Sequence, residues 1–148
     1  MIQGFGDFNF SLTFSAIGSA LGTGVAGMAA VGAWKKAFSL NKTAPFAMIA
    51  FVGAPLTQTI YGMILRDRII KANLPADPQT YIYQMIIGIV AGLAIGASAY
   101  MQGKAAATAC DALAETGKGF GQYIMVLGVI ETVALFVMAF CMMALPKG

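Results

Sequence analysis

The sequence predicts an all-α membrane protein with four transmembrane helices arranged as two tandem hairpins. Of its 148 residues, 59% are hydrophobic and only 10% are charged. The mean hydropathy is +0.78, which is far above that of a soluble domain. Four apolar stretches, each near the ~20 residues that a helix needs to cross a hydrocarbon core, are separated by clusters of charged residues.

The four predicted spans follow one another with short charged connections. The first covers about 12–34 and the second about 44–65, and three lysines lie between them. The third covers about 81–103 and the fourth about 119–145; five charged residues precede the third span and four precede the fourth.

The connections leave no room for a soluble domain, because the longest has about fifteen residues. The chain is therefore predicted to be a single membrane domain over 1–148, with hairpin one at about 12–65 and hairpin two at about 81–145. The start, MIQGFGDFNF, has no Lys or Arg and carries Asp7. It lacks the basic region of a cleavable signal peptide, so we expect the first helix to remain.

The charges and cysteines exclude some functions. The net charge of +3 comes from lysines and arginines in connections, so it does not indicate nucleic-acid binding. Cys110 and Cys141 lack metal-ligand spacing, and the chain has no histidine; we expect these cysteines in a loop and facing lipid. The connections after the first and third spans carry five basic residues, whereas the middle connection and the termini, including Lys147, carry four. Because basic residues favour the cytoplasmic side, this difference weakly favours a cytoplasmic position for the connections after the first and third spans.

The two halves of the chain resemble each other. With a three-residue difference in loop length, two pairs of segments align, namely VAGMAA (25–30) with MQGKAA (101–106) and PLTQTI (55–60) with GVIETV (128–133). In this alignment Gln58 of hairpin one corresponds to Glu131 of hairpin two. A duplicated hairpin thus has one ionisable copy and one neutral copy.

Small residues recur at a four-residue spacing in both odd spans. The glycines are Gly18 and Gly22 in the first and Gly88, Gly92 and Gly96 in the third. Such stripes let helix backbones approach closely in a membrane. Two stripes in register with a repeat favour a crowded, repetitive assembly over an isolated four-helix monomer.

The central chemical feature is Glu131, a single acid within the apolar run LGVIETVALFVMAF. An ionised carboxylate at a helix centre costs at least ~2.5 to 3.5 kcal/mol on insertion scales. A proton, a basic partner or a bound cation must therefore neutralise it. Because all nine lysines and arginines are expected in loops or at helix ends, an internal salt bridge is not predicted.

Oxygen-bearing side chains in other spans favour a cation. Thr57, Gln58 and Tyr61 share one broad face of the second span, and Pro55 before them loosens nearby carbonyls. Hard cations bind several oxygens. Gln102 could add another, provided that the third helix extends past Lys104 through the alanine-rich KAAATACDALAET.

Each of these side chains also has a structural reading. Thr57 could bond to a carbonyl of its own helix, Gln58 and Gln102 could join helices, and Tyr61 could pack at the membrane interface. An intramembrane acid, by contrast, is functional by default. The combination with Glu131 therefore favours a cation site.

At these residues the chain resembles the proteolipid rotor subunit of the V-type rotary ATPases, known as the K or c subunit. Two fused hairpins, glycine-striped odd helices and the Glu in GVIETVALF carry the resemblance, which covers 14–143. It implies a homo-oligomeric ring in lipid that turns against a stator subunit with an essential arginine and connects to the central stalk. It implies an integral multi-pass membrane protein, in the cell membrane if the source is prokaryotic. ATP hydrolysis would occur in other subunits, and no glycine cluster here forms a P-loop.

The resemblance also implies a sodium-binding branch. In that branch the acid is accompanied by a Thr-Gln pair, a tyrosine and a Gln-Gly pair, and a backbone carbonyl completes the set. The matching residues are Thr57, Gln58, Tyr61, Gln102 and Glu131, with the carbonyl at Ala54, where leucine is more usual. Transport of H⁺ by the same rotor is the alternative to Na⁺. A small secondary transporter or a structural four-span protein are the remoter ones.

Overall fold

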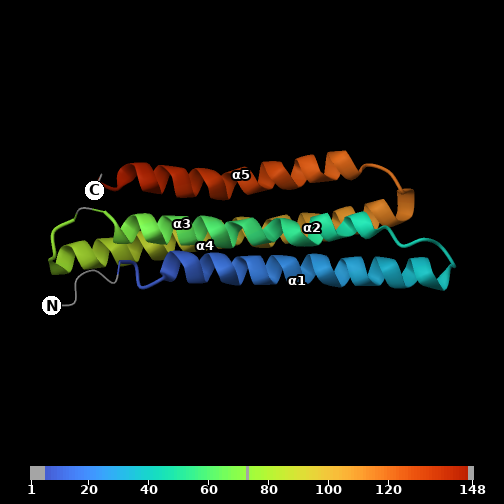
Figure 1. Cartoon of the computed structure of the whole chain (residues 1–148), viewed down its shortest axis with the longest axis horizontal. Coiled ribbons are helices and arrows are strands. Elements are labelled where there is room, and N and C mark those ends of the chain that lie inside the picture. The colour runs from blue at the N-terminus through green and yellow to red at the C-terminus, as the bar shows by residue number, and fades with distance from the viewer. Residues whose placement is uncertain (1–5, 73, 147–148) are drawn as a thin grey trace.

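The computed structural model describes residues 6–72 and 74–146, and their regular elements are all helical. Figure 1 shows long helices lying side by side along one axis. They are α1 (Phe10–Ser39), α2 (Ile49–Gly53), α3 (Thr57–Ile70), α4 (Pro78–Thr116) and α5 (Phe120–Ala144), with the short 3₁₀ segments η1 (Phe46–Met48) and η2 (Ala54–Leu56) before and after α2.

The elements confirm the predicted fold class. Segments η1 to α3 form one continuous span over Phe46–Ile70, which gives, in the described part of the chain, four helices long and apolar enough to cross a membrane. The protein is an integral multi-pass membrane protein. Residues 1–5 of the start and Lys147, which entered the orientation argument, lie outside the described residues.

Helix α4 is longer than the apolar stretch that predicts it, because the alanine-rich run after Lys104 continues the helix to Thr116. This confirms the extension expected for Gln102. It also corrects two expectations. Lys104 lies inside a long helix and not in a loop or at a helix end, and Cys110 is fully buried in α4 and not in a loop.

Helices α1 and α4 run in the same direction (Figure 1), and their backbones touch where glycines face each other. A Cβ atom built on Gly18 would lie 2.0 Å from the carbonyl oxygen of Gly96, and one on Gly103 would lie 2.2 Å from Cα of Gly22. The two glycine stripes therefore meet each other within a single chain. Only glycine permits this approach.

Gly88 and Gly92 continue the same contact toward the start of α1. A Cβ on Gly88 would collide with the side chain of Asp7, and one on Gly92 would lie 2.8 Å from the carbonyl oxygen of Phe10. Asp7 is fully buried, and its carboxylate accepts a 2.8 Å hydrogen bond from the backbone N–H of Ser11 in the first turn of α1. Asp7 stands two residues before the N-cap Asn9, and its carboxylate satisfies a free N–H of the first turn as a capping side chain does.

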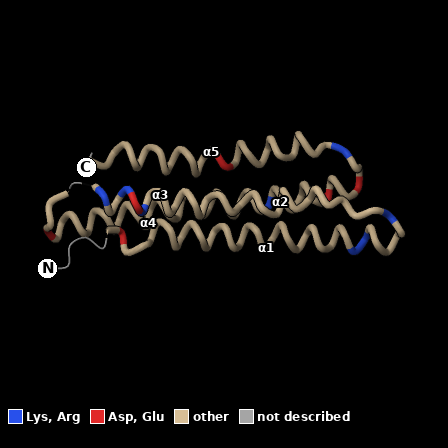
Figure 2. Tube along the Cα trace, in the orientation of Figure 1, with Lys and Arg blue, Asp and Glu red and all other residues tan. Residues whose placement is uncertain are grey.

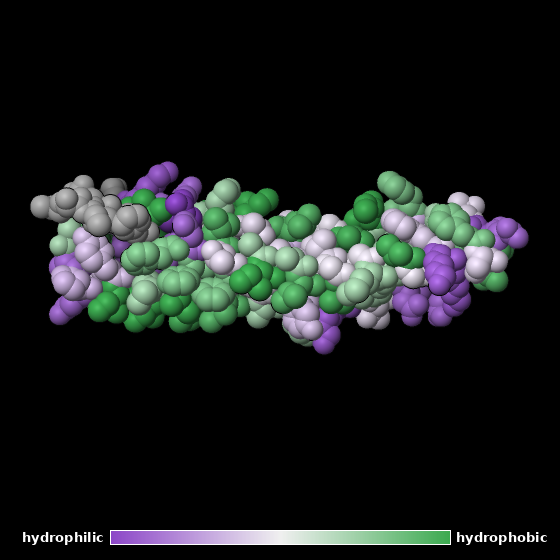
Figure 3. Space-filling model, turned by 90° about the horizontal axis from the view of Figure 1, so that it is seen from below, coloured by the Kyte–Doolittle hydropathy of each residue, from purple (hydrophilic) through white to green (hydrophobic). Residues whose placement is uncertain are grey.

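Helix α5 packs on α3 and α4 through one side only. Leu127 and Ala134 are buried, whereas Val129, Val133 and Phe136 are more than half exposed. Figure 2 shows most charged residues toward the ends of the bundle, and Figure 3 shows apolar residues over much of the middle of one face. The apolar outer sides suit a lipid environment.

Candidate functional site

The second span is interrupted where Pro55 stands. Proline has no N–H to donate and displaces the carbonyl four residues earlier, so residues Ala54–Leu56 form a 3₁₀ turn between α2 and α3. The carbonyl oxygen of Ala54 accepts a 3.1 Å hydrogen bond from Oγ1 of Thr57. A backbone oxygen and a hydroxyl are thereby fixed together at the start of α3.

Helix α3 presents its polar side chains to α4 and α5. Gln58 is fully buried, and its Nε2 donates to Oε1 of Gln102 on α4 at 2.7 Å. Its own Oε1 accepts from Oγ1 of Thr57 at 3.2 Å. These bonds form a chain of oxygens and amides that leads from the helix break into the interface between α3 and α4.

Gln102 links this chain to α5. It is fully buried, and its Nε2 donates to the backbone carbonyl of Leu127 at 2.9 Å and to Oε2 of Glu131 at 3.2 Å. The extension of α4 beyond Lys104 is what puts Gln102 level with the acid. The difference in depth that the sequence suggested between these two side chains is thereby removed.

Both oxygens of the half-buried Glu131 carboxylate accept hydrogen bonds. The second donor is the hydroxyl of Tyr61, one turn along α3 from Thr57, at 2.6 Å from Oε1. In residues 6–72 and 74–146 the two ion pairs are Lys36 with Glu115 and Arg66 with Asp67. Glu131 has no basic partner in this part of the chain.

Three oxygens lie close together around Thr57, at separations that are common both to hydrogen bonds and to the ligands of a cation. Oxygen ligands lie about 2.3–2.6 Å from Ca²⁺, and since Na⁺ has nearly the same ionic radius, neighbouring ligand oxygens around it lie roughly 3.4 Å apart. Thr57 Oγ1 lies 3.1 Å from the carbonyl oxygen of Ala54 and 3.2 Å from Oε1 of Gln58. These three oxygens could form one side of a coordination shell.

The structure also shows the purely structural roles that the sequence allowed for these residues. Thr57 bonds to a carbonyl of its own span, and the bond between Gln58 and Gln102 joins two helices. Sequence reasoning missed Ser98, one turn before Gln102 on α4, whose hydroxyl donates to the carbonyl of Ile130 on α5 at 3.0 Å. Its four-residue spacing from Gln102 was the available signal.

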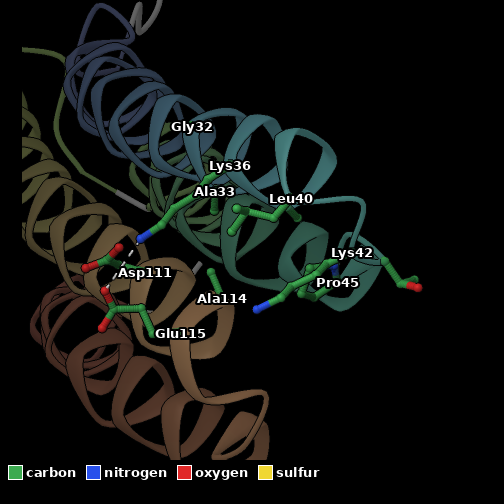
Figure 4. A pocket seen from close by; sticks show the side chains of 11 residues that line it. Gly32, Ala33, Lys36, Leu40, Lys42, Pro45, Asp111, Ala114 and Glu115 are labelled. Atoms are coloured by element: carbon green, nitrogen blue, oxygen red, sulfur yellow. Dashed lines mark ion pairs between the residues drawn. The ribbon is translucent and has the colours of Figure 1, made fainter.

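A separate cavity of about 390 Å³ lies at the end of the bundle near the α4–α5 turn. Figure 4 shows Lys36, Lys42, Asp111 and Glu115 around it, with Lys36 Nζ 3.9 Å from Glu115 Oε1. None of the predicted site residues lines it. Its charges are mixed and largely exposed, so they define no particular ligand.

The fold and the site define a class, namely a four-span membrane protein in which a carboxylate near the middle of the last span is held by neutral polar side chains. Residues 85–144 match the model of the family of the ATP synthase C subunit. The matched segment contains Gln102 and Glu131, whereas Thr57, Gln58 and Tyr61 lie outside it. A search of curated proteins finds no match. Hairpin two is therefore similar to the non-catalytic, ion-translocating subunit of rotary ATPases, which supports the expected proteolipid class.

Proposed function

We propose that this chain is a rotor-ring subunit of a V-type ATPase that binds one Na⁺ at Glu131 and carries it as the ring turns. Identical copies would form the ring, a stator subunit would supply an arginine, and central-stalk subunits would connect the ring to the ATP-hydrolysing head. The chain itself would catalyse no reaction. The single observation that carries the proposal is the Glu131 carboxylate, bonded by Tyr61 and Gln102 and without a basic partner in the described residues.

The charge balance of the site supports a monovalent cation. Thr57, Gln58 and Gln102 contribute oxygens without adding charge, so Na⁺ and the carboxylate would together be neutral. A neutral site can pass through lipid without the cost of an isolated charge. A permanent internal lysine or arginine would keep the carboxylate paired and block exchange of the ion.

The V-type assignment rests on the duplicated hairpin. Glu131 lies in the last span of hairpin two, and in the alignment of the two hairpins its counterpart in hairpin one is Gln58. Gln58 bonds to Gln102 and through it reaches Glu131. In this proposal the neutral copy of the repeat has become a ligand for the ion of the other copy.

Binding of the ion would need only local turning of side chains. Tyr61 can stay on Oε1 of Glu131 and keep the carboxylate oriented. The amide of Gln102 would turn so that its Oε1, like Oε2 of Glu131, points at Na⁺. This turn would break the bonds of Gln102 to Gln58 and to the carbonyl of Leu127, so the amide of Gln58 would turn as well. When Glu131 meets the stator arginine, the carboxylate gains a new partner and the ion leaves.

Transport of H⁺ is the second candidate, and one observation favours it. The polar side chains of the site already bond to one another without an ion, from Thr57 through Gln58 and Gln102 to Glu131 and Tyr61. A protonated Glu131 could sit in the same network if the hydroxyl of Tyr61 turned, so that it accepted the new O–H and no longer donated to Oε1.

Carbodiimide labelling of the purified complex, with and without Na⁺ over a range of pH, separates the two candidates. Carbodiimides attack a protonated carboxyl, so bound Na⁺ should slow labelling at Glu131, and Glu131→Gln should remove the labelled site. Thr57→Val should raise the Na⁺ concentration needed for protection. The matched control is Thr132→Val, because the exposed Thr132 bonds only to the carbonyl of Val129.

Three results would count against parts of the proposal. Labelling that Na⁺ leaves unchanged at every pH would remove the sodium assignment and leave the proton. Full ion pumping by Glu131→Gln would indicate a structural four-span protein. A chain that never forms a ring of many copies in mild detergent would point to a small secondary transporter.

A further inference from the structure

A buried hydroxyl of α1 has no hydrogen-bond partner. Ser19 is 2% exposed, and its Oγ bonds to no residue in 6–72 or 74–146. Ser15 lies one turn earlier on the same face and is also buried, but its Oγ donates to the carbonyl of Ser11 at 2.6 Å. Buried polar groups are rarely left unpaired, because losing water without gaining a partner is costly. The neighbours of Ser19 should therefore explain its hydroxyl.

The contacts between α1 and the second span fix their relative register. The two spans run in opposite directions (Figure 1). A Cβ atom built on Gly62 would lie 2.5 Å from Oγ of Ser15, and one built on Gly22 would lie 3.0 Å from Cβ of Pro55. Ser15 precedes Gly22 by seven residues, and Gly62 follows Pro55 by seven. Each step forward along α1 therefore corresponds to one step back along the second span.

This register places Ser19 beside the candidate ion site. One turn on from the Gly62 contact, Ser19 of α1 lies level with Gln58 of α3. Residues four apart share a face of a helix, so Ser19 and Gln58 stay on the faces that α1 and α3 turn toward each other. Gln58 is fully buried as well. The unpartnered hydroxyl thus faces the helix that carries this amide.

Binding of Na⁺ would remove the acceptor that the Gln58 amide now has. Nε2 of Gln58 donates to Oε1 of Gln102 at 2.7 Å. If that oxygen turns to the ion, as the proposed sodium site requires, Nε2 is left buried without an acceptor. A serine hydroxyl can accept two hydrogen bonds, and its own O–H can still donate to a carbonyl of its helix, as that of Ser15 does. Ser19 can therefore accept the amide that Gln102 releases.

We propose that Ser19 is a positioning residue of the ion site, whose Oγ accepts a hydrogen bond from Nε2 of Gln58 when Na⁺ is bound. This bond would hold the amide with Oε1 of Gln58 toward the ion and beside Oγ1 of Thr57, 3.2 Å away. The terminal torsion of a glutamine is broad, so the amide can exchange one acceptor for the other by turning. The inference rests on the proposed sodium site, and it makes α1, which supplies no ligand, part of that site.

The Na⁺ concentration that half protects Glu131 from carbodiimide tests this role on the purified complex at one pH. Ser19→Ala should raise that concentration about tenfold, which corresponds to ~1.4 kcal/mol and lies within the cost of a buried donor left unpaired. Ser15→Ala is the matched control, because Ser15 is buried on the same face one turn away and its hydroxyl bonds to its own helix. The control should leave the concentration unchanged.

Unfolding by SDS without Na⁺ separates this role from a purely structural one. Ser19→Ala should unfold at the same or higher SDS than wild type, since it loses an unpaired hydroxyl and gains a better helix former. A lower midpoint, an unchanged half-protecting concentration in Ser19→Ala, or an equal rise in Ser15→Ala would overturn this inference and leave the sodium site standing. A wild type that Na⁺ does not protect would overturn the sodium site and this inference together.

Discussion

Gly18→Ala is expected to force α1 away from α4. The new Cβ would lie 2.0, 2.3 and 2.4 Å from the O, Cα and C atoms of Gly96, whereas Cβ atoms essentially never come within 3.0 Å of such neighbours. All three are backbone atoms, so no side chain can move aside. The helices must separate locally by about 1 Å, the difference between the required and available distances.

The cost follows from this separation. Overpacking of a well-packed interface costs ~1–3 kcal/mol, and a gap of up to 1 Å forfeits a quarter to a half of the dispersion energy of the atoms beside it. We therefore expect a loss near the upper end, ~3 kcal/mol. Gly24→Ala on the same helix is the control, because a Cβ there meets nothing within 4 Å and only gains the ~0.5–1 kcal/mol of a better helix former.

The assay is reversible unfolding of the purified protein in mixed micelles by increasing SDS, followed by circular dichroism. Gly18→Ala should unfold at lower SDS than wild type, and Gly24→Ala at the same or higher SDS. Equal midpoints for the two variants would refute the idea that the backbone contact between α1 and α4 requires glycine.

Three further outcomes are expected. Tyr61→Phe removes a hydrogen bond to the Glu131 carboxylate, worth ~1.5–3 kcal/mol for a charged group, so carbodiimide should label Glu131 about tenfold faster or more; an unchanged rate would show that the hydroxyl does not restrain the acid. Gln102→Leu leaves the buried amide of Gln58 without its acceptor and should cost ~1–3 kcal/mol in the SDS assay; wild-type stability would mean that Gln58 finds another partner. Asp7→Ala removes the carboxylate that bonds to the first turn of α1 and should lower the stability in the SDS assay by ~0.5–2 kcal/mol. An unfolding midpoint equal to that of wild type would contradict this role of Asp7.

The sequence predicted the gathering of the site's side chains well. Helical spacing alone placed Thr57, Gln58 and Tyr61 on one face, and the structure brings that face to Gln102 and Glu131. The prediction succeeded because few polar side chains lie at the depth of Glu131, so few combinations of partners were possible. Whether the site binds Na⁺ stays a prediction, since the same bonds serve a proton.

The sequence predicted the end of the third helix less well. Charged residues after Met101 suggested a connection, but the alanines between them favour helix, and α4 continues to Thr116. For this reason the predictions that Lys104 lies in a loop or at a helix end and that Cys110 lies in a loop were wrong. The glycine stripes likewise could not reveal their partner, because small residues permit close contact with any helix, inside the chain or outside it.

The backbone contact between α1 and α4 has a mechanical consequence. Side chains between two helices act as compliant spacers, since each can bend or change rotamer under load. Where Gly18 meets Gly96 and Gly22 meets Gly103 there are no such spacers, so contact between the two backbones sets the distance between the helices. Gln102 directly precedes Gly103, so a shift of α1 against α4 would move the amide that bonds to the carboxylate of Glu131.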